Sequence, residues 1–432
     1  MGNSDNSARL IGKTVKPARL AKACSKLLVV PAFLLVSACL EPTGGQNTGD
    51  NSVSTSETPT TDPSFSKIDF VDLAGWDTDD LGAALHTFRK SCERILIASP
   101  TRALDTKTGA TSLYGSVGDW QPVCTLAMDA AATSDPRGFF ERNFQPFRVS
   151  GEAGPVGLMT GYYEPEIQGS LSQGGIYQTP LLAKPADLMR LDLNDFDPNL
   201  GNESIRGRIE NGRFVPYPDR AAINRGVLGA LARPVAWIAD PVDAFFTHIQ
   251  GSARIVLPDG DVLRASFAGK NGRPYTAIGK VLIEEGALAR ENVSMQTIRD
   301  WLNANPSEVK TVLEANQSYV FFNAVPLRDK TVGPTGAAGI ALTPGRSLAV
   351  DRRIHALGAP IWLDAQLPGN TEPERRLMIA QDTGSAIRGA VRGDYFWGSG
   401  AQAGSAAGET KAEGQFAALI PRVLANRWSE TP

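Results

Sequence analysis

The spacing of hydrophobic and polar positions divides the chain into four stretches. A basic lead is followed by an apolar run over residues 27–36, which stops at Ser37-Ala38-Cys39. Residues 41–66 contain almost no large apolar side chain and are rich in Gly, Asn, Ser, Thr and Pro. Apolar positions at helical spacing come next, and from Phe147 they give way to short β-like runs cut by Gly and Pro. This order predicts an export signal, a flexible tether (39–66) and a folded body large enough for two domains.

The apolar run of the leader is only ten residues long, whereas roughly twenty are needed to span a bilayer. Together with the cysteine that follows, residues 1–38 resemble a bacterial lipoprotein signal. The resemblance implies that Cys39 carries lipid as the first residue of the mature protein, and Leu40 after it favours the outer membrane. We therefore expect a lipid anchor on the periplasmic face of the outer membrane of a Gram-negative bacterium. An ordinary cleaved signal with an incidental cysteine is the alternative.

Two stretches near the start of the body have helical periodicity. Leu81, Leu85, Phe88 and Cys92 form an i, i+4, i+7, i+11 stripe after an N-cap signal, and residues 120–131 suggest a second helix. If the two helices pack together, Cys92 meets Cys124. In an oxidising compartment this pair is a candidate disulfide, and two buried free thiols are the alternative.

The rest of the body has mainly β character. Strand-like runs cover residues 157–166 and 319–322, and the clearest hairpin joins 253–257 to 262–267. Helical segments are predicted at 278–285 and 295–315, the latter divided by its proline. The dense Gly and Pro spacing favours barrel architecture with a few peripheral helices over a doubly wound sheet.

The charge balance argues against nucleic acid as a partner, and the histidine and cysteine content argues against a metal site. The chain has 43 Lys and Arg against 46 Asp and Glu, and removal of residues 1–38 leaves 37 against 45. A mildly acidic body without a basic stripe argues against nucleic acid as a partner. The chain has three histidines, no HExxH and no Cys-His cluster. Nothing in it therefore predicts a metal site.

The stretch 381–398 is the strongest candidate for chemistry. Asp382 and Asp394 lie twelve positions apart, each close to glycines, and Tyr395-Phe396-Trp397 follow the second. Aromatic bulk can desolvate a carboxyl and raise its pKa, which a general acid in a sugar cleft requires. In the alternative, both Asp side chains cap turns between two strands. The sequence around Asp382 also spells an aspartic-peptidase signature, but that chemistry needs a second Asp-Thr/Ser-Gly, which the chain lacks.

Five stretches stand in the order found in the membrane-bound lytic murein transglycosylases of the MltA type, which this sequence resembles over its whole body. They are residues 161–165, 240–252, 269–275, 342–351 and 381–398. The resemblance implies a double-psi β-barrel domain from residues 67–165 and 316–432, which is catalytic. It also implies an inserted β-barrel-like domain, residues 166–315, and a deep groove between the two that holds a peptidoglycan glycan strand.

The same resemblance implies the reaction and its residues. It indicates a lytic exotransglycosylase, a carbon-oxygen lyase that cuts the β-1,4 bond from N-acetylmuramic acid to N-acetylglucosamine and leaves a 1,6-anhydromuramoyl end, without cofactor. The essential acid is then Asp394. The expected substrate-binding residues are Asp382, Tyr162, Tyr163, Gln250, Lys270, Gly384 and Ala386. Turn caps and core aromatics are the structural alternatives for these residues, and the role of Glu164, an additional carboxylate, stays open.

A single carboxyl group is chemically sufficient for this reaction. Glycosidases generally use two carboxylates, but here the C6 hydroxyl of the muramoyl ring can attack its own C1 with a large effective concentration. One acid can donate a proton to the leaving oxygen and then accept the proton of the C6 hydroxyl. We therefore expect a raised pKa at Asp394 and activity on the acidic side.

Other readings remain at this stage. A non-catalytic glycan-binding lipoprotein on the same fold would have no use for an acid at Asp394. A metal-dependent hydrolase would be inhibited by chelators. The resemblance also suggests murein synthases or scaffold proteins as partners, and the sequence leaves open whether cleavage starts at strand ends or within strands.

Overall fold

The computed structural model describes residues 63–109, 112–200, 203–369 and 371–429. The predicted signal, Cys39 with its predicted lipid, and nearly all of the predicted tether lie outside these ranges. Among the helices within them, none is both long and apolar enough to cross a membrane.

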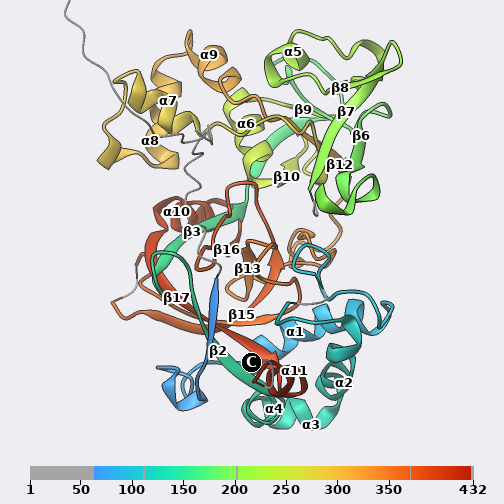
Figure 1. Cartoon of the computed structure of the whole chain (residues 1–432). Coiled ribbons are helices and arrows are strands. Elements are labelled where there is room, and N and C mark those ends of the chain that lie inside the picture. The colour runs from blue at the N-terminus through green and yellow to red at the C-terminus, as the bar shows by residue number, and fades with distance from the viewer. Residues whose placement is uncertain (1–62, 110–111, 201–202, 370, 430–432) are drawn as a thin grey trace, which may run out of the picture. The chain divides into compact units, whose positions relative to one another are not determined.

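Six strands close into a β-barrel. Around the barrel they follow the order β17, β14, β15, β13, β16, β3, and pairing of β3 with β17 closes the ring (Figure 1). Two neighbouring pairs are parallel, β13 with β15 and β16 with β3. The bounds are β3 Gly157–Glu164, β13 Ser347–Val350, β14 Pro360–Ala365, β15 Glu374–Asp382, β16 Gly393–Ser399 and β17 Lys411–Pro421. β2 (Phe144–Ser150) and β1 (Ser64–Lys67) extend the sheet from β17. The mainly β, barrel-type fold is thus confirmed.

A second sheet has the order β12, β11, β10, β4, β9, β5. Its strands are β4 Glu166–Ser170, β5 Thr179–Leu182, β9 Pro234–Ile238, β10 Ser252–Val256, β11 Val262–Lys270 and β12 Val320–Pro326. The predicted hairpin is β10 and β11, which pair antiparallel. β12 pairs with β11, and Phe322 is buried in this sheet's core, so the second sheet includes residues beyond 315. A separate three-stranded sheet holds β6 Met189–Asp192, β7 Ser204–Glu210 and β8 Arg213–Pro216.

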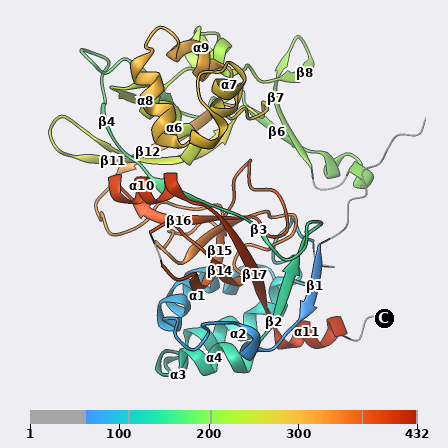
Figure 2. The same cartoon turned by 90° about the vertical axis from the view of Figure 1, so that its left-hand side faces the viewer.

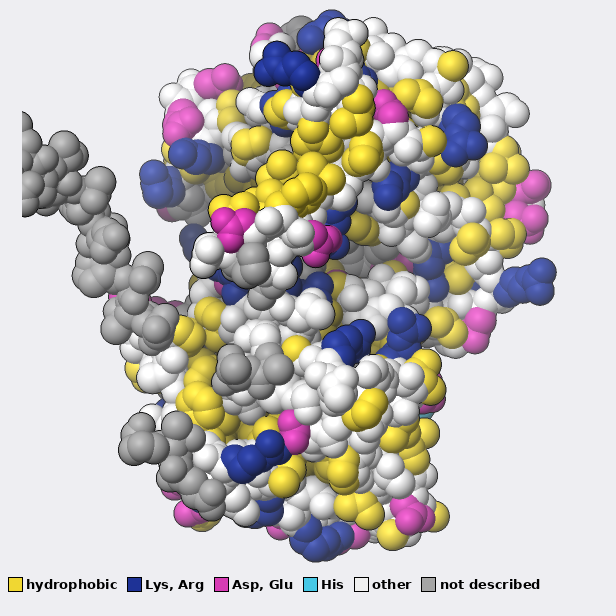
Figure 3. Space-filling model, turned by 45° about the vertical axis from the view of Figure 1, so that its right-hand side comes forward, with side chains coloured by type: hydrophobic (Ala, Val, Ile, Leu, Met, Phe, Trp, Pro, Cys, Tyr) yellow, Lys and Arg dark blue, Asp and Glu magenta, His cyan; other side chains and the backbone are white. Residues whose placement is uncertain are grey.

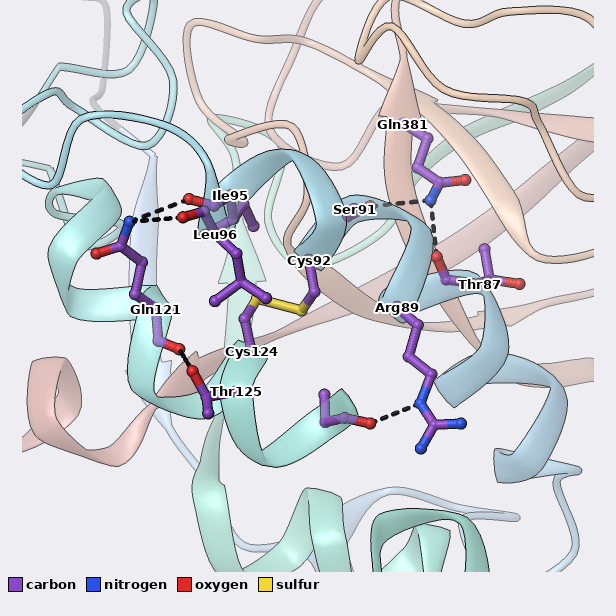
Figure 4. The surroundings of a disulfide bond; sticks show 11 residues. Thr87, Arg89, Ser91, Cys92, Ile95, Leu96, Gln121, Cys124, Thr125 and Gln381 are labelled. Carbon is purple, nitrogen blue, oxygen red and sulfur yellow. Dashed lines mark hydrogen bonds between the residues drawn. A yellow bond between two sulfur atoms is a disulfide. The ribbon is translucent and has the colours of Figure 1, made fainter. Parts of the chain in front are cut away.

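Four helices gather beside the barrel (Figures 1 and 2). They are α1 Leu81–Leu96, α2 Val117–Met128, α3 Ala130–Ser134 and α4 Pro136–Asn143, and α11 Arg422–Ser429 follows β17. The predicted helix starts where the Asp80 carboxylate accepts the Ala83 N–H, and its stripe is buried in the barrel's core. Cys92 of α1 and Cys124 of α2 are joined by a disulfide (Figure 4). Two free thiols are therefore the wrong alternative.

The remaining helices belong mostly to the inserted part. They are α5 Arg220–Asn224, α6 Pro241–Gln250, α7 Ile278–Glu284, α8 Met295–Ala304 and α9 Val309–Glu314, while α10 Ala401–Glu409 lies between β16 and β17 in the chain. Figure 2 shows α6 to α9 as one group, and they share an apolar cluster. Short 3-10 turns occur at Phe70–Asp72, Leu193–Asp195, Pro198–Leu200, Gly229–Leu231 and Arg290–Asn292.

A buried ion cluster joins the barrel to the second sheet. Glu164, the last residue of β3, is fully buried. Its Oε1 accepts from Arg264 Nε at 2.7 Å and its Oε2 from Arg254 Nε at 2.8 Å. Ser399 also donates its hydroxyl to Oε2 at 2.8 Å. The Glu164 carboxylate is therefore paired with two guanidinium groups and one hydroxyl that come from other strands or their ends.

We predict that Glu164→Gln lowers the free energy of unfolding by about 3 kcal/mol or more, because the buried guanidinium of Arg264 and the largely buried one of Arg254 lose their counter-charge. Chemical denaturation measures this loss. Glu166→Gln is the matched control, since Glu166 lies two residues later and is exposed. Equal unfolding midpoints for the two variants would contradict a structural role for the cluster.

Candidate active site

Strand register places Asp394 beside Thr160. β16 runs parallel to β3 with Asp394 opposite Thr160 and Phe396 opposite Tyr162. Because side chains alternate along a strand, Asp394 and Phe396 share one face of β16. Tyr395 and Trp397 point to the other face, where their rings pack at 4.8 Å between centroids. Of the three aromatic residues expected to desolvate Asp394, only Phe396 is therefore on its side.

A short hydrogen-bond chain holds the Asp394 carboxyl. Thr160 Oγ1 donates to Asp394 Oδ1 at 2.6 Å. Arg392 Nη2 donates to the same Thr160 oxygen at 2.8 Å. A hydroxyl group can donate one hydrogen bond and accept others, so Thr160 links the acid to a guanidinium that does not bind it directly. The arrangement orients Asp394 without a close ion pair.

The surroundings of Asp394 favour its protonated form. Burial raises its pKa to about 6, and the charge of Asp382 adds to the rise, while the Thr160 hydrogen bond and Arg392 oppose it. Protein surrounds the carboxyl densely, yet residue 394 as a whole stays partly exposed. Because burial disfavours the charged form, Asp394 can carry a proton at mildly acidic pH and remain within reach of a ligand.

Asp382 ends β15 and fixes two backbone segments. Its Oδ1 accepts the N–H groups of Ala337 and Thr383, each at 2.9 Å. Burial raises its pKa, whereas these hydrogen bonds lower it. Asp382 therefore anchors the chain on both sides of the site and places its charge close to Asp394.

The loop of residues 383–392, which connects the two aspartates, is anchored from the buried side. Asp351 Oδ2 accepts the Gly389 N–H at 3.0 Å. His355 Nε2 is hydrogen-bonded to the Ala390 carbonyl oxygen at 2.7 Å. His355 Nδ1 is hydrogen-bonded to the Tyr114 hydroxyl at 2.8 Å. A carbonyl oxygen can only accept, so Nε2 carries the proton. Burial lowers the pKa of His355, which keeps the ring neutral and the anchor intact.

The structure separates the predicted tyrosine pair. Tyr162 packs on Phe396 at 5.1 Å between ring centroids. Its buried hydroxyl lies close to Asp382 but forms no hydrogen bond with it. The pKa of Tyr162 is raised mainly by burial and, to a smaller extent, by the negative charges of Asp382 and Asp394. Tyr163 faces the opposite way and packs on α10, while its N–H donates to Gln250 Oε1 at 3.2 Å. Successive strand residues alternate, so Tyr163 and Gln250 do not join Tyr162 beside the aspartates.

The other predicted binding residues meet on the 383–392 loop. Lys270, at the end of β11, donates through Nζ to Ser385 Oγ at 2.8 Å. Gly384 and Ala386 flank that serine. The structure thus brings Asp394, Asp382 and Tyr162 together and connects Lys270 to the loop between the aspartates.

Thr160 and Arg392 are site residues that were not predicted. Thr160 lies 234 positions from Asp394 in sequence, and only the parallel register of β3 and β16 brings them together. Thr160 directly precedes the recognised stretch 161–165, and Arg392 lies within the stretch 381–398. Within the ranges that the structure describes, no group of three His, Cys, Asp or Glu side chains is arranged to hold a metal ion.

Two family models match successive parts of the chain. Residues 158–323 match the "MltA specific insert domain" family and residues 346–420 match the "3D domain" family. The membrane-bound lytic murein transglycosylase A of Vibrio cholerae is 30% identical over 311 residues, covering 69% of this chain and 73% of that protein.

Solved structures agree over a larger share of the chain. The membrane-bound lytic murein transglycosylase of Agrobacterium tumefaciens is 35% identical with a TM-score of 0.74, and the match covers 84% of this chain and 99% of that one. MltA of Escherichia coli with bound chitohexaose is 26% identical with a TM-score of 0.59, over 84% of this chain and 93% of that one. The chain therefore belongs to the family of membrane-bound lytic murein transglycosylase A.

Proposed function

We propose that this protein is a lytic transglycosylase that cleaves the β-1,4 bond between N-acetylmuramic acid and N-acetylglucosamine in peptidoglycan, with Asp394 as its acid and base. The observation that carries the proposal is a carboxyl with a pKa raised to about 6, on a partly exposed residue and held by Thr160 in the fold of this family. Glu164, the carboxylate at the end of the neighbouring strand β3, is paired with two arginines.

In the first step Asp394 donates its proton to the glycosidic oxygen. The bond between this oxygen and C1 of the muramoyl ring breaks, and N-acetylglucosamine leaves as an alcohol. Positive charge develops at C1 and the ring oxygen. The new Asp394 carboxylate is stabilised by the Thr160 hydrogen bond and, through it, by Arg392.

In the second step the C6 hydroxyl of the same ring attacks C1. The attack is intramolecular and therefore has a large effective concentration. The hydroxyl proton passes to the Asp394 carboxylate, which restores the acid for the next cycle. A C1–O6 bond replaces the C1–O4 bond, no water is consumed, and the product is the 1,6-anhydromuramoyl end.

The proposal also covers the division of the chain into two domains and the location of the protein in the cell. The barrel would comprise residues 67–165 and 327–432, with the inserted part between them and the glycan strand in a groove at their junction. The contact from Lys270 to Ser385 supports a junction at the 383–392 loop. The names of the relatives indicate association with a membrane, and a lipid anchor on Cys39 at the outer membrane is the form we propose.

We predict that Asp394→Asn lowers the rate of product release from purified peptidoglycan by roughly 10²–10⁴-fold, because the amide can neither donate nor accept the proton. Product release is measured by chromatography of the soluble fragments. Binding of the variant to sacculi should be retained. Asp300→Asn, an exposed change on α8, is the control. A wild type that binds sacculi and releases nothing would favour a glycan-binding lipoprotein instead.

We also predict that kcat/KM is highest below pH 6 and falls about tenfold per pH unit above it. The raised pKa of Asp394 means that the required acid form is populated below about 6 and is lost as the pH rises through that value. A pH–rate profile of fragment release measures this dependence. A profile that is flat to pH 8 would exclude Asp394 as the initial donor.

Thr160→Val tests the cause of this dependence. The Thr160 hydrogen bond lowers the pKa of Asp394, so its removal should move the alkaline limb to higher pH while the maximal rate falls because the carboxyl loses its orientation. Thr160→Ser keeps the hydroxyl and should retain the wild-type limb. An unchanged limb in Thr160→Val would contradict the assigned coupling.

A further inference from the structure

Three cationic side chains from distant parts of the chain converge at the loop between the two aspartates. Arg206 comes from β7, Lys270 from the end of β11, and Arg388 from the loop itself. Together they form the cationic cluster. Burial, followed by the charges of Arg206 and Arg388, lowers the pKa of Lys270. The backbone at Gly272 lies so close to Arg206 that a Cβ there would be 2.8 Å from the Arg206 Cβ.

The cationic cluster has little compensation from the protein. Within the described residues, the Arg206 side chain makes no hydrogen bond or ion pair and has only the nearby charge of Asp192 to oppose its own, and Lys270 binds a neutral hydroxyl. The residue directly opposite Arg206 on β6 is Arg190, which binds Asp192. Like charges directly opposite on neighbouring strands are destabilising. A half-buried cation without a partner is costly, so the cluster is suited to an anion from outside the chain.

Arg388, the third member of the cluster, has one carboxylate within ion-pair distance, and that carboxylate already binds another arginine. Arg388 Nη1 lies 3.8 Å from Asp351 Oδ1. The same carboxylate binds Arg353 through both oxygens, at 3.0 Å and 2.6 Å, and accepts the Gly389 N–H. Arg388 is about half exposed. Its guanidinium can therefore reach a bound ligand while Asp351 continues to hold the loop.

The place of the cluster indicates which part of a ligand carries the anion. Ser385, bound by Lys270, follows Asp382 by three residues, and Arg388 precedes Asp394 by six. A group at the cluster would thus belong to a sugar bound near Asp394. Figure 3 shows Lys and Arg side chains (dark blue) recurring across the middle of one face of the molecule.

Muramic acid differs from glucosamine by a lactyl ether on O3. Its carboxyl group is free in peptide-stripped glycan and carries a stem peptide with further carboxylates in intact peptidoglycan. We propose that Arg206, Lys270 and Arg388 bind a carboxylate of this muramoyl substituent, and so select muramoyl glycan over neutral glycan. The inference rests on the proposed function, because it takes the glycan to be bound at Asp394.

Binding of three probes to the Asp394→Asn protein, which does not consume them, tests the proposal. Chitohexaose is neutral, peptide-stripped glycan strands carry the lactyl carboxylate, and peptide-bearing strands carry the stem carboxylates. Adding Arg206→Gln should weaken binding of anionic strands roughly tenfold, the loss of one charge-assisted hydrogen bond, and leave chitohexaose unchanged. Weaker binding of the peptide-stripped strands alone identifies the lactyl carboxylate, and weaker binding of the peptide-bearing strands alone identifies a stem-peptide carboxylate. Weaker binding of both shows that the cluster accepts either carboxylate.

Matched variants keep the outcome interpretable. Lys310→Gln removes one positive charge at an exposed position of α9 and should change none of the affinities. Arg388→Gln, at an exposed position, should reproduce the Arg206→Gln result even if the latter disturbs folding. Equal affinity changes for all three probes, or no change for any, would overturn the proposal.

The same panel separates the two proposals. If wild type cleaves peptidoglycan but Arg206→Gln and Arg388→Gln do not discriminate the probes, the cluster assignment fails and the reaction stands. If wild type releases no fragments while the variants do discriminate, the reaction is wrong and the carboxylate site stands.

Discussion

The parallel pairing of β16 with β3 is the constraint on which the site depends. It places Thr160 opposite Asp394 although 234 positions separate them, and barrel closure through β17 keeps both strands in place. The close approach continues at Gly161, where a Cβ would be 2.6 Å from Trp397 Nε1 and 2.8 Å from the Ala407 Cα. Glycine is the only residue that allows this contact without displacing a neighbour.

Environment assigns different roles to the carboxylates around β3. Glu164 is fully buried but receives hydrogen bonds from Arg254, Arg264 and Ser399, and it therefore joins the barrel to the second sheet as an anion. Asp394 accepts a hydrogen bond from the Thr160 hydroxyl, and Arg392 is hydrogen-bonded to that hydroxyl and not to Asp394 itself. The first carboxyl is compensated and the second is left with a raised pKa. Such divergent environments are how proteins separate structural anions from working acids.

Local patterns in the sequence predicted much of the fold, and long-range register accounts for what they missed. The stripe over Leu81 to Cys92 became α1 because its period and N-cap are local features. Asp394 was predicted from its own stretch, whereas Thr160 is brought to it by the β3–β16 register. Arg392 lies in the same stretch as Asp394, but its role depends on its hydrogen bond to Thr160. The split of Tyr162 from Tyr163 follows from strand alternation, and β12 joined the second sheet by pairing with β11. Unlike α1, the Thr160–Asp394 contact and the pairing of β12 with β11 join residues far apart in sequence, and no short window of residues encodes them.

The central claim is that one acid cleaves the glycan and that the substrate's own hydroxyl replaces water. Digestion of purified peptidoglycan in water enriched with oxygen-18, followed by mass spectrometry of the fragments, tests it most directly. The account predicts muramoyl ends that are one water lighter than hydrolytic fragments and carry no label. Fragments with oxygen-18 at the muramoyl C1 would contradict it, because they would show that water, and not the C6 hydroxyl, attacked the sugar.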